Sequence, residues 1–199
     1  MKHAVKLVVL GLSLLLANGS ILYAQDLRKG FEAYDNKDYT QALRELRPLA
    51  EQGDAIAQNY IGLMYGLGEG VAKDDREALK WYRLSAEQGF TMAQFSLGYA
   101  YQVGRGVTQD YREALKWYRL SAEQGNELAQ NNLGQMYGLG QGVPQDYVLA
   151  HMWFNIAVSN GVERAAKIRD ELAQQMTKEQ LAEAQKLARE CQQKKYKRC

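Results

Sequence analysis

The chain has 199 residues, of which 46% are hydrophobic and 24% are charged, a composition typical of a globular protein with one core rather than of a disordered chain. Residues 1–24 contain two lysines and no acid, which leaves 23 basic and 23 acidic residues in the rest of the chain. This neutral balance gives no support for nucleic-acid binding, which depends on a basic surface.

Residues 1–24 have the three-part layout of a secretory signal peptide, in which two lysines precede an apolar run at 7–17 and Leu-Tyr-Ala follows. The run is shorter than the roughly 20 residues of a membrane span, and Asn-Gly-Ser interrupts it, which disfavours the alternative of an anchor helix. We therefore expect cleavage after Ala24, a periplasmic or secreted location, and no membrane span in the mature chain.

An internal repeat organises the sequence that follows. Fourteen residues, REALKWYRLSAEQG, occur at 76–89 and again at 112–125, which sets a period of 36. A fixed period of this length indicates stacked structural units, because one helical hairpin cannot bury its own apolar face. The period delimits a half unit over 25–53 and full units over 54–89, 90–125 and 126–161.

Each unit is predicted to contain two helices joined by a Gly-x-Gly-Val loop, since apolar residues recur at helical spacing on both sides of it. Asp74, Asp110 and Asp146 are the predicted N-caps of the second helices, and the glycine that closes each unit suits a left-handed C-cap. We interpret the loop as structural, because a phosphate-binding loop follows a strand and ends in Gly-Lys-Ser/Thr.

Two kinds of residue recur at positions that predict helix packing. A glycine lies in the middle of each first helix, where it costs about 1 kcal/mol relative to alanine, so we expect the paired helix to approach closely there. A tryptophan begins an aromatic pair in each second helix, and we expect it in the core between layers rather than in a sugar-binding stripe. These structural residues are Gly62, Gly98, Gly134, Trp81, Trp117 and Trp153.

The repeated motif resembles that of the Sel-1-like repeat family, a relative of the tetratricopeptide repeats. Its pattern, roughly A-x-x-x-L-G-x-x-Y-x-x-G-x-G-V-x-x-D-x-x-x-A-x-x-W-Y, can be read three times, and the resemblance covers residues 38–161. The resemblance implies an all-α, right-handed α/α solenoid of helical hairpins. It also implies a scaffold or adaptor role in protein–protein contacts, with no catalytic activity and no cofactor. Residues 162–190 look like the helices that close such arrays.

The positions that vary between the first helices predict a partner-binding surface. In solenoids of this type the first helices line the concave side, and spacings of i, i+4 and i+7 place residues along one stripe. Phe95 and Tyr99 would form an aromatic centre flanked by amides, which suits an extended peptide or a partner helix; the alternative is a surface that varies freely. The predicted residues are Asn59, Tyr60, Leu63, Phe95, Tyr99, Asn131, Asn132 and Gln135.

Catalytic and metal-binding residues are not predicted. His151 is the single histidine after residue 24, so no set of several histidines or His–Cys–Asp can be assembled, and we expect a packed imidazole at a position that is leucine in the sister units.

Two other functions stay open. One is binding or hydrolysis of cell-wall fragments or β-lactams, as in cysteine-rich relatives that carry a Cys pair in each repeat. The other is a structural role within a larger assembly.

The last nine residues form a basic tail that begins at Cys191 and ends at Cys199. On one continuous helix eight residues span about 12 Å, beyond the Cα separation of about 7 Å that a disulfide allows. A bridge within the chain therefore requires the tail to fold back, and pairing between two chains is the alternative; we expect a monomer. The cluster of Lys and Arg is either a solvated end or a contact for an acidic surface.

Overall fold

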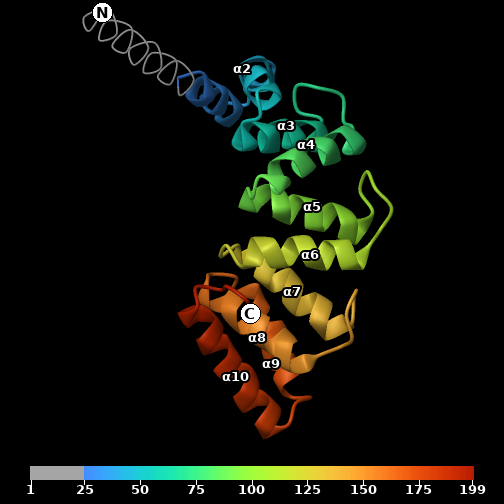
Figure 1. Ribbon diagram of the computed structural model, residues 1–199, viewed down its shortest axis with the longest axis vertical. Coiled ribbons are helices and arrows are strands. Elements are labelled where there is room, and N and C mark those ends of the chain that lie inside the picture. Colours follow the sequence, from blue (N-terminus) through green and yellow to red (C-terminus); the bar gives the residue numbers. More distant parts are fainter. Residues whose placement is uncertain (1–24) are drawn as a thin grey trace, which may run out of the picture.

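The computed structural model describes residues 25–199, and this part of the chain is all helical, with hairpins stacked into an elongated solenoid (Figure 1). The predicted signal peptide, residues 1–24, lies outside the described residues. Residues 25–35 are helical, and the helices that follow are α2 (Tyr39–Glu51), α3 (Ala55–Leu67), α4 (Asp75–Glu87), α5 (Thr91–Val103), α6 (Tyr111–Ala122), α7 (Glu127–Leu139), α8 (Tyr147–Ser159), α9 (Arg164–Ala173) and α10 (Lys178–Gln193).

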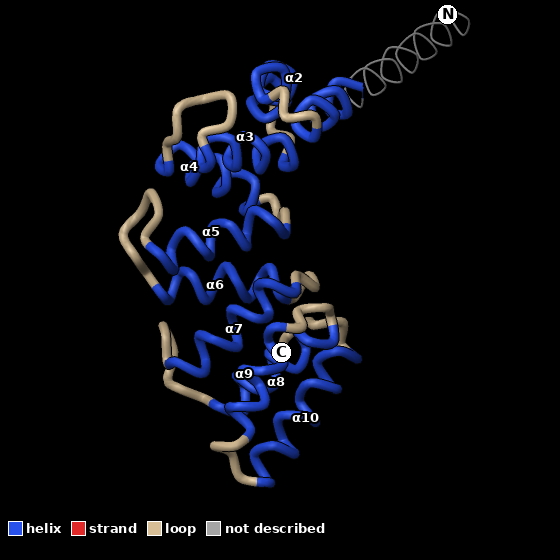
Figure 2. The backbone as a smooth tube through the Cα atoms, turned by 180° about the vertical axis from the view of Figure 1, so that it is seen from behind, coloured by secondary structure: helices blue, strands red, loops and turns tan. Residues whose placement is uncertain are grey.

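The hairpins are α3–α4, α5–α6 and α7–α8, and the second helix of each contacts the first helix of the next. The three Gly-x-Gly-Val loops lie along one edge of the stack (Figure 2). At the C-terminal end α9 takes the place of a further first helix against α8, and α10 also packs on α8. The predicted solenoid of helical hairpins is confirmed.

The helix boundaries follow from capping residues that recur with the period. Asp74 and Asp110 each accept two backbone N–H groups of the first helical turn at 2.9–3.1 Å, and Asp146 accepts from Leu149 N. The first glycine of each loop ends the first helix in a left-handed conformation. The second meets the preceding layer: a Cβ at Gly142 would lie 2.6 Å from the carbonyl oxygen of Tyr111. The loop therefore packs against the preceding layer, which agrees with its interpretation as a structural loop.

Contact between a glycine and an aromatic ring sets the distance between the helices of each hairpin. Cβ atoms added to the central glycines would lie 2.7–2.8 Å from the nearest ring carbon. Real Cβ atoms do not approach so closely, so the ring occupies the space that a side chain would fill. The pairs are Gly62 with Tyr82, Gly98 with Tyr118, and Gly134 with Phe154.

The tryptophans differ in depth. Trp153 is buried in the C-terminal core, whereas Trp81 and Trp117 are half-buried. Trp81 packs against the α2–α3 core cluster, and Trp117 against the cluster formed by α4 and α5. Trp81 and Trp117 thus pack into clusters that include the second helix of the preceding layer. The second aromatic of the pair is fully enclosed at Tyr118 and Phe154, whereas Tyr82 is partly buried.

A ladder of buried amides connects successive layers. In the first full unit Gln58 Nε2 donates to the carbonyl oxygen of Ala50 at 3.0 Å, and Gln88 Nε2 donates to Gln58 Oε1 at 2.8 Å. Each such glutamine adds a side-chain donor to a carbonyl at the end of the preceding second helix, which also accepts the N–H of the glycine that closes the unit. The same two bonds recur as Gln94 to Ala86 with Gln124 to Gln94, and as Gln130 to Ala122 with Asn160 to Gln130.

The C-terminal tail folds back on α10 and extends this ladder. Lys195 N donates to Gln192 O and Tyr196 N to Cys191 O, a Schellman ending in which Lys195 has φ of 51°. This reversal brings the Cα atoms of Cys191 and Cys199 to 5.4 Å in disulfide geometry within the chain. Tyr196 OH then donates to Asn160 Oδ1 at 3.0 Å. The tail therefore fastens α10 to the last repeat.

Replacing Gly98 by alanine should destabilise the fold. The new Cβ would displace the Tyr118 ring, a strain of about 1–3 kcal/mol that outweighs the gain in helix propensity of about 1 kcal/mol. The control is Gly138→Ala, whose Cβ would lie 3.6 Å from Ala150 Cβ in ordinary contact, so it should be neutral or stabilising. Urea unfolding followed by circular dichroism measures both; equal midpoints for the two variants would contradict the close-approach argument.

Opening the tail should also lower stability. For Cys199→Ser we expect a loss of about 2–3 kcal/mol, since the unfolded chain gains the freedom that a short closed loop removes. The variant should unfold at the same urea concentration with and without reductant, and reduced wild type should match it. A disulfide-linked dimer of the wild type on a non-reducing gel would contradict pairing within the chain.

Candidate protein-interaction surface

The first helices of the three units are almost free of charge. Helices α3 and α5 contain no Asp, Glu, Lys or Arg, and α7 contains Glu127 alone. The second helices α4 and α6, in contrast, carry several charged residues each. In the first two units the charge therefore lies on the second helices, whereas α8 of the last unit carries no Asp, Glu, Lys or Arg. The exposed part of the first helices offers apolar and amide groups.

Exposed apolar side chains recur at matching positions of these first helices. Leu67, Val103 and Leu139 are 55%, 47% and 68% exposed and lie one period apart at the helix ends. Ile56, Met92 and Tyr99 are also exposed. We call these six residues the first-helix face. Exposed apolar residues that recur in register over three layers are characteristic of interaction sites.

The structure distributes the predicted partner-binding residues unevenly. Tyr99 is 41% exposed, and Arg105 lies over its ring at 5.9 Å from the centroid. Four others are partly exposed and remain candidates for contact with a partner: Asn59, Leu63, Asn132 and Gln135. Tyr99 is the predicted aromatic residue that a partner reaches most readily.

Three predicted residues are less available to a partner: Asn131 is buried, and Phe95 and Tyr60 pack against other aromatic rings. Asn131 is only 2% exposed, so its assignment to a binding stripe is wrong, because a partner cannot reach its side chain. Phe95, one period earlier, correspondingly packs on Tyr118 with ring centroids 5.8 Å apart. Tyr60 is covered by the N-terminal helix, whose Phe31 and Tyr34 rings lie 4.7 and 5.1 Å from its own. Helix spacing predicted which residues lie along one side of each first helix, but it could not predict which other helices cover them.

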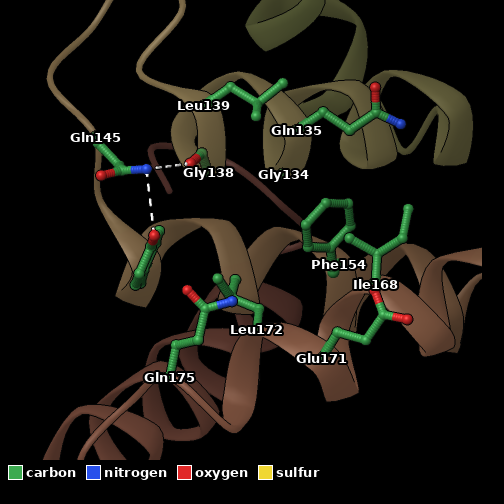
Figure 3. A pocket seen from close by; sticks show the side chains of 11 residues that line it. Gly134, Gln135, Gly138, Leu139, Gln145, Phe154, Ile168, Glu171, Leu172 and Gln175 are labelled. Carbon is green, nitrogen blue, oxygen red and sulfur yellow. Dashed lines mark hydrogen bonds between the residues drawn. The ribbon is translucent and has the colours of Figure 1, made fainter.

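A cavity of about 400 Å³ opens between α7, α8 and α9 (Figure 3). Leu139 and Gln135 line it from α7, and Ile168, Glu171 and Leu172 from α9. The Phe154 ring, which covers Gly134, forms the inner wall (Figure 3). Since Leu139 belongs to the first-helix face, the cavity lies at the C-terminal end of that face.

The same place in the first unit is almost closed. A recess of about 60 Å³ remains between Gly66, Tyr82 and the next unit. There Arg105 of the next loop reaches back to Asp75, with Arg105 Nε 3.6 Å from Asp75 Oδ1. In the last unit Tyr147 replaces this aspartate and α9 replaces the next repeat, so no such bridge forms and the cavity opens.

In the middle unit a side chain fills this position. Gln102 stands where the other units have Gly66 and Gly138, and Tyr118 OH donates to Gln102 Oε1 at 2.7 Å. Burial raises the pKa of Tyr118 and raises that of Tyr82 to about 12, so both hydroxyls stay protonated. The last unit has Phe154 at this position and therefore contributes neither a hydroxyl nor a glutamine.

Sequence reasoning missed this cavity. Its signal was a difference between units at two structural positions: Gly, Gln and Gly at 66, 102 and 138, and Tyr, Tyr and Phe at 82, 118 and 154. The α9 residues carry no periodic signal, because α9 lies beyond the last repeat. Their approach to α7 follows from the packing of α9 on α8.

Within residues 25–199 no three His, Cys, Asp or Glu side chains gather as metal ligands would. None of the helices described combines the length and hydropathy that crossing a bilayer requires. His151 is buried, and its environment includes Arg169 and Asp170 of α9. It is therefore a packed side chain, as its leucine counterparts suggested.

The stacked hairpins and their uncharged face define a helical-repeat protein, and comparison with known families specifies which. The Sel1 repeat model matches residues 55–90, 91–126 and 128–162, more than half of the chain, so the chain belongs to the Sel1 repeat family. Repeats of this family generally form non-catalytic scaffolds for protein interaction. The resemblance expected from the motif is confirmed.

Two solved structures are similar to the chain. A Sel1 repeat protein from Oxalobacter formigenes is 39% identical with a TM-score of 0.67, and the match covers 70% of this chain and 56% of that one. The protein c5321, a protective antigen present in uropathogenic Escherichia coli strains displaying an SLR fold, is 30% identical with a TM-score of 0.62, covering 87% and 46%. The chain thus spans about half the length of either. No curated protein matches it.

His151 should make stability pH-dependent. Burial, and then the positive charge of Arg169, lower its pKa, while Asp170 acts in the opposite direction. As the pH falls below about 6.5, His151 is therefore protonated to a greater extent in the unfolded chain than in the folded chain. The free energy of unfolding decreases as a result. His151→Leu, which copies the sister units, should show a smaller drop in thermal midpoint between pH 7.5 and 5.5. An unchanged drop would mean that other groups account for it.

Proposed function

We propose that this chain is an exported, non-catalytic scaffold that binds a protein partner through its first-helix face. The observation that carries the proposal is the row formed by Leu67, Val103 and Leu139, exposed apolar residues at one position of three successive layers. Exposing such side chains is unfavourable in water, so a row kept over three units favours a surface that a partner covers.

Tyr99 supplies a suitable anchor near the middle of this face. Tyrosine is enriched among residues that dominate binding energy, because its ring buries a large area while its hydroxyl can still bond. Asn59, Asn132 and Gln135 offer amides on either side along the stack. This combination suits a polypeptide partner, which presents both apolar side chains and main-chain polar groups.

Two observations support export. Residues 1–24 have the composition of a signal peptide, and Cys191 and Cys199 lie in disulfide geometry, which is stable in oxidising compartments. The similar Escherichia coli protein is described as a protective antigen, which fits a location outside the cytoplasm. We propose a periplasmic or secreted chain that acts as a monomer.

Cross-linking from the face tests this function. A photoreactive residue at position 99 should capture a specific partner in the producing cell, whereas one at Lys80, exposed on α4, should not. With the identified partner, Tyr99→Ala should weaken binding by about tenfold or more, in the range of an interface hot spot, and leave the helical circular dichroism unchanged. Tyr99 is the clean choice because Phe95 also supports Tyr118.

The control is Lys80→Ala, which should bind the partner as wild type does. The captured chain should begin at Gln25, as N-terminal sequencing would show. Equal affinity of Tyr99→Ala and wild type would exclude the first-helix face as the binding surface, and a chain that retains residues 1–24 would exclude cleavage at the predicted site.

A further inference from the structure

We propose, building on the scaffold function above, that the cavity between α7, α8 and α9 holds one bulky apolar side chain of an extended partner peptide. We propose further that Glu171 at its rim favours a lysine or arginine next to that side chain in the partner. The partner is thus defined by its chemistry: an unfolded segment in which a large apolar residue is flanked by a cation.

The apolar walls of the cavity set the first requirement. Phe154 and Leu172 line its inner part, and Leu139 and Ile168 border it with exposed side chains. At about 400 Å³ the cavity falls within the range of ligand sites and suits one large side chain rather than a folded element. An aromatic or long aliphatic residue would contact the buried Phe154 and Leu172 and remove the exposed Leu139 and Ile168 side chains from water.

Charge sets the second requirement. Glu171 is the one charged residue that lines the cavity, and the repeat unit 126–161 contains two acids, Glu127 and Asp146, and no Lys or Arg. Lys167 Nζ lies 3.8 Å from Glu171, but both side chains are largely exposed, and such pairs are weak. An incoming cation can therefore replace Lys167, whereas an acidic residue in the partner would meet only negative charge in the lining.

Side-chain amides set the third requirement. Gln145 is occupied, since it donates to the carbonyl oxygen of Gly138 at 2.7 Å and to Tyr147 OH at 3.3 Å (Figure 3). Gln135 and Gln175, also in the lining, make no side-chain hydrogen bond to any residue of the described chain. They can pair with the main chain of a peptide. An extended segment has free N–H and C=O groups for this purpose, whereas a helix satisfies its own.

The repeat itself supplies a variant that fills the cavity. Gly138→Gln copies Gln102, which occupies this position in the middle unit, and the added Cβ would make only ordinary contact with Ala150. The matched control is Gly66→Gln, the same change in the first unit, where Gly66 is likewise unhindered. A second variant, Gly138→Gln with Phe154→Tyr, recreates the bonded pair of the middle unit should the single change disturb folding.

The experiment is a titration of the isotope-labelled chain with ten-residue peptides, followed by two-dimensional NMR. The probes have a Gly/Ser/Asn background around Lys-Trp-Lys, Lys-Ser-Lys or Glu-Trp-Glu. We expect Lys-Trp-Lys to shift the amide signals of Gly134, Gly138 and α9. Lys-Ser-Lys should bind at least tenfold more weakly, and Glu-Trp-Glu about threefold more weakly. Glu171→Gln should abolish the preference for lysine.

Gly138→Gln should weaken Lys-Trp-Lys binding at least tenfold, with Gly66→Gln within twofold of wild type. The proposal is overturned if Gly138→Gln binds normally, if the shifts lie elsewhere, or if N-acetyl-tryptophan amide binds as tightly as the peptide, which would indicate a small-molecule site.

The experiments distinguish failure of the cavity proposal from failure of the proposed scaffold function. Loss of partner binding in Tyr99→Ala with normal binding in Gly138→Gln would retain the face and exclude the cavity, and the reverse would retain only the cavity.

Discussion

The close contact between a helical glycine and an aromatic ring is the constraint on which this solenoid depends. Because Gly98 has no side chain, Tyr118 can lie directly on the backbone of α5, and the same holds for Gly62 with Tyr82 and Gly134 with Phe154. The ring replaces the glycine's missing side chain as packing material, so the cost of glycine in a helix is offset by tertiary contact. Each hairpin thereby repeats the same glycine–ring contact, and similar hairpins can stack with one period.

Stacking also requires that polar groups between layers be satisfied, and the amide ladder meets this requirement. Gln58, Gln94 and Gln130 are buried, and each bonds a carbonyl of the preceding layer. A buried amide is stabilising only when its partners are in place, so the ladder fixes the offset between layers as well as their contact. At the C-terminal end Tyr196 bonds Asn160, and the tail that carries it closes at Cys199. The last layer thus ends in a bonded tyrosine rather than in a further repeat.

The same regularity explains where binding groups arise. A repeated core leaves the outward positions of the first helices to vary, and in this chain they hold apolar and amide residues, with Glu127 as the single charged residue of these helices. The cavity arises where regularity ends. In the earlier layers Arg105 or Gln102 closes the space between helices, whereas the last unit has Gly138 and Phe154 and is followed by α9. The first-helix face therefore follows from the repetition of the unit. The cavity follows from the end of the repeat array, where α9 packs instead of a further unit.

The sequence by itself determined the all-helical repeat, its period, the caps at Asp74, Asp110 and Asp146, and the need for close approach at the central glycines. These properties depend on residues near one another in the chain or equivalent in each unit, and a periodic sequence displays them directly. Tertiary structure alone decided that Asn131 is buried, that the N-terminal helix covers Tyr60, and that Trp81 stays half-exposed. It also decided that Ile168 and Glu171 lie across a cavity from Leu139. These outcomes depend on which elements pack at the two ends of the array, where the repeat stops and no periodic signal remains.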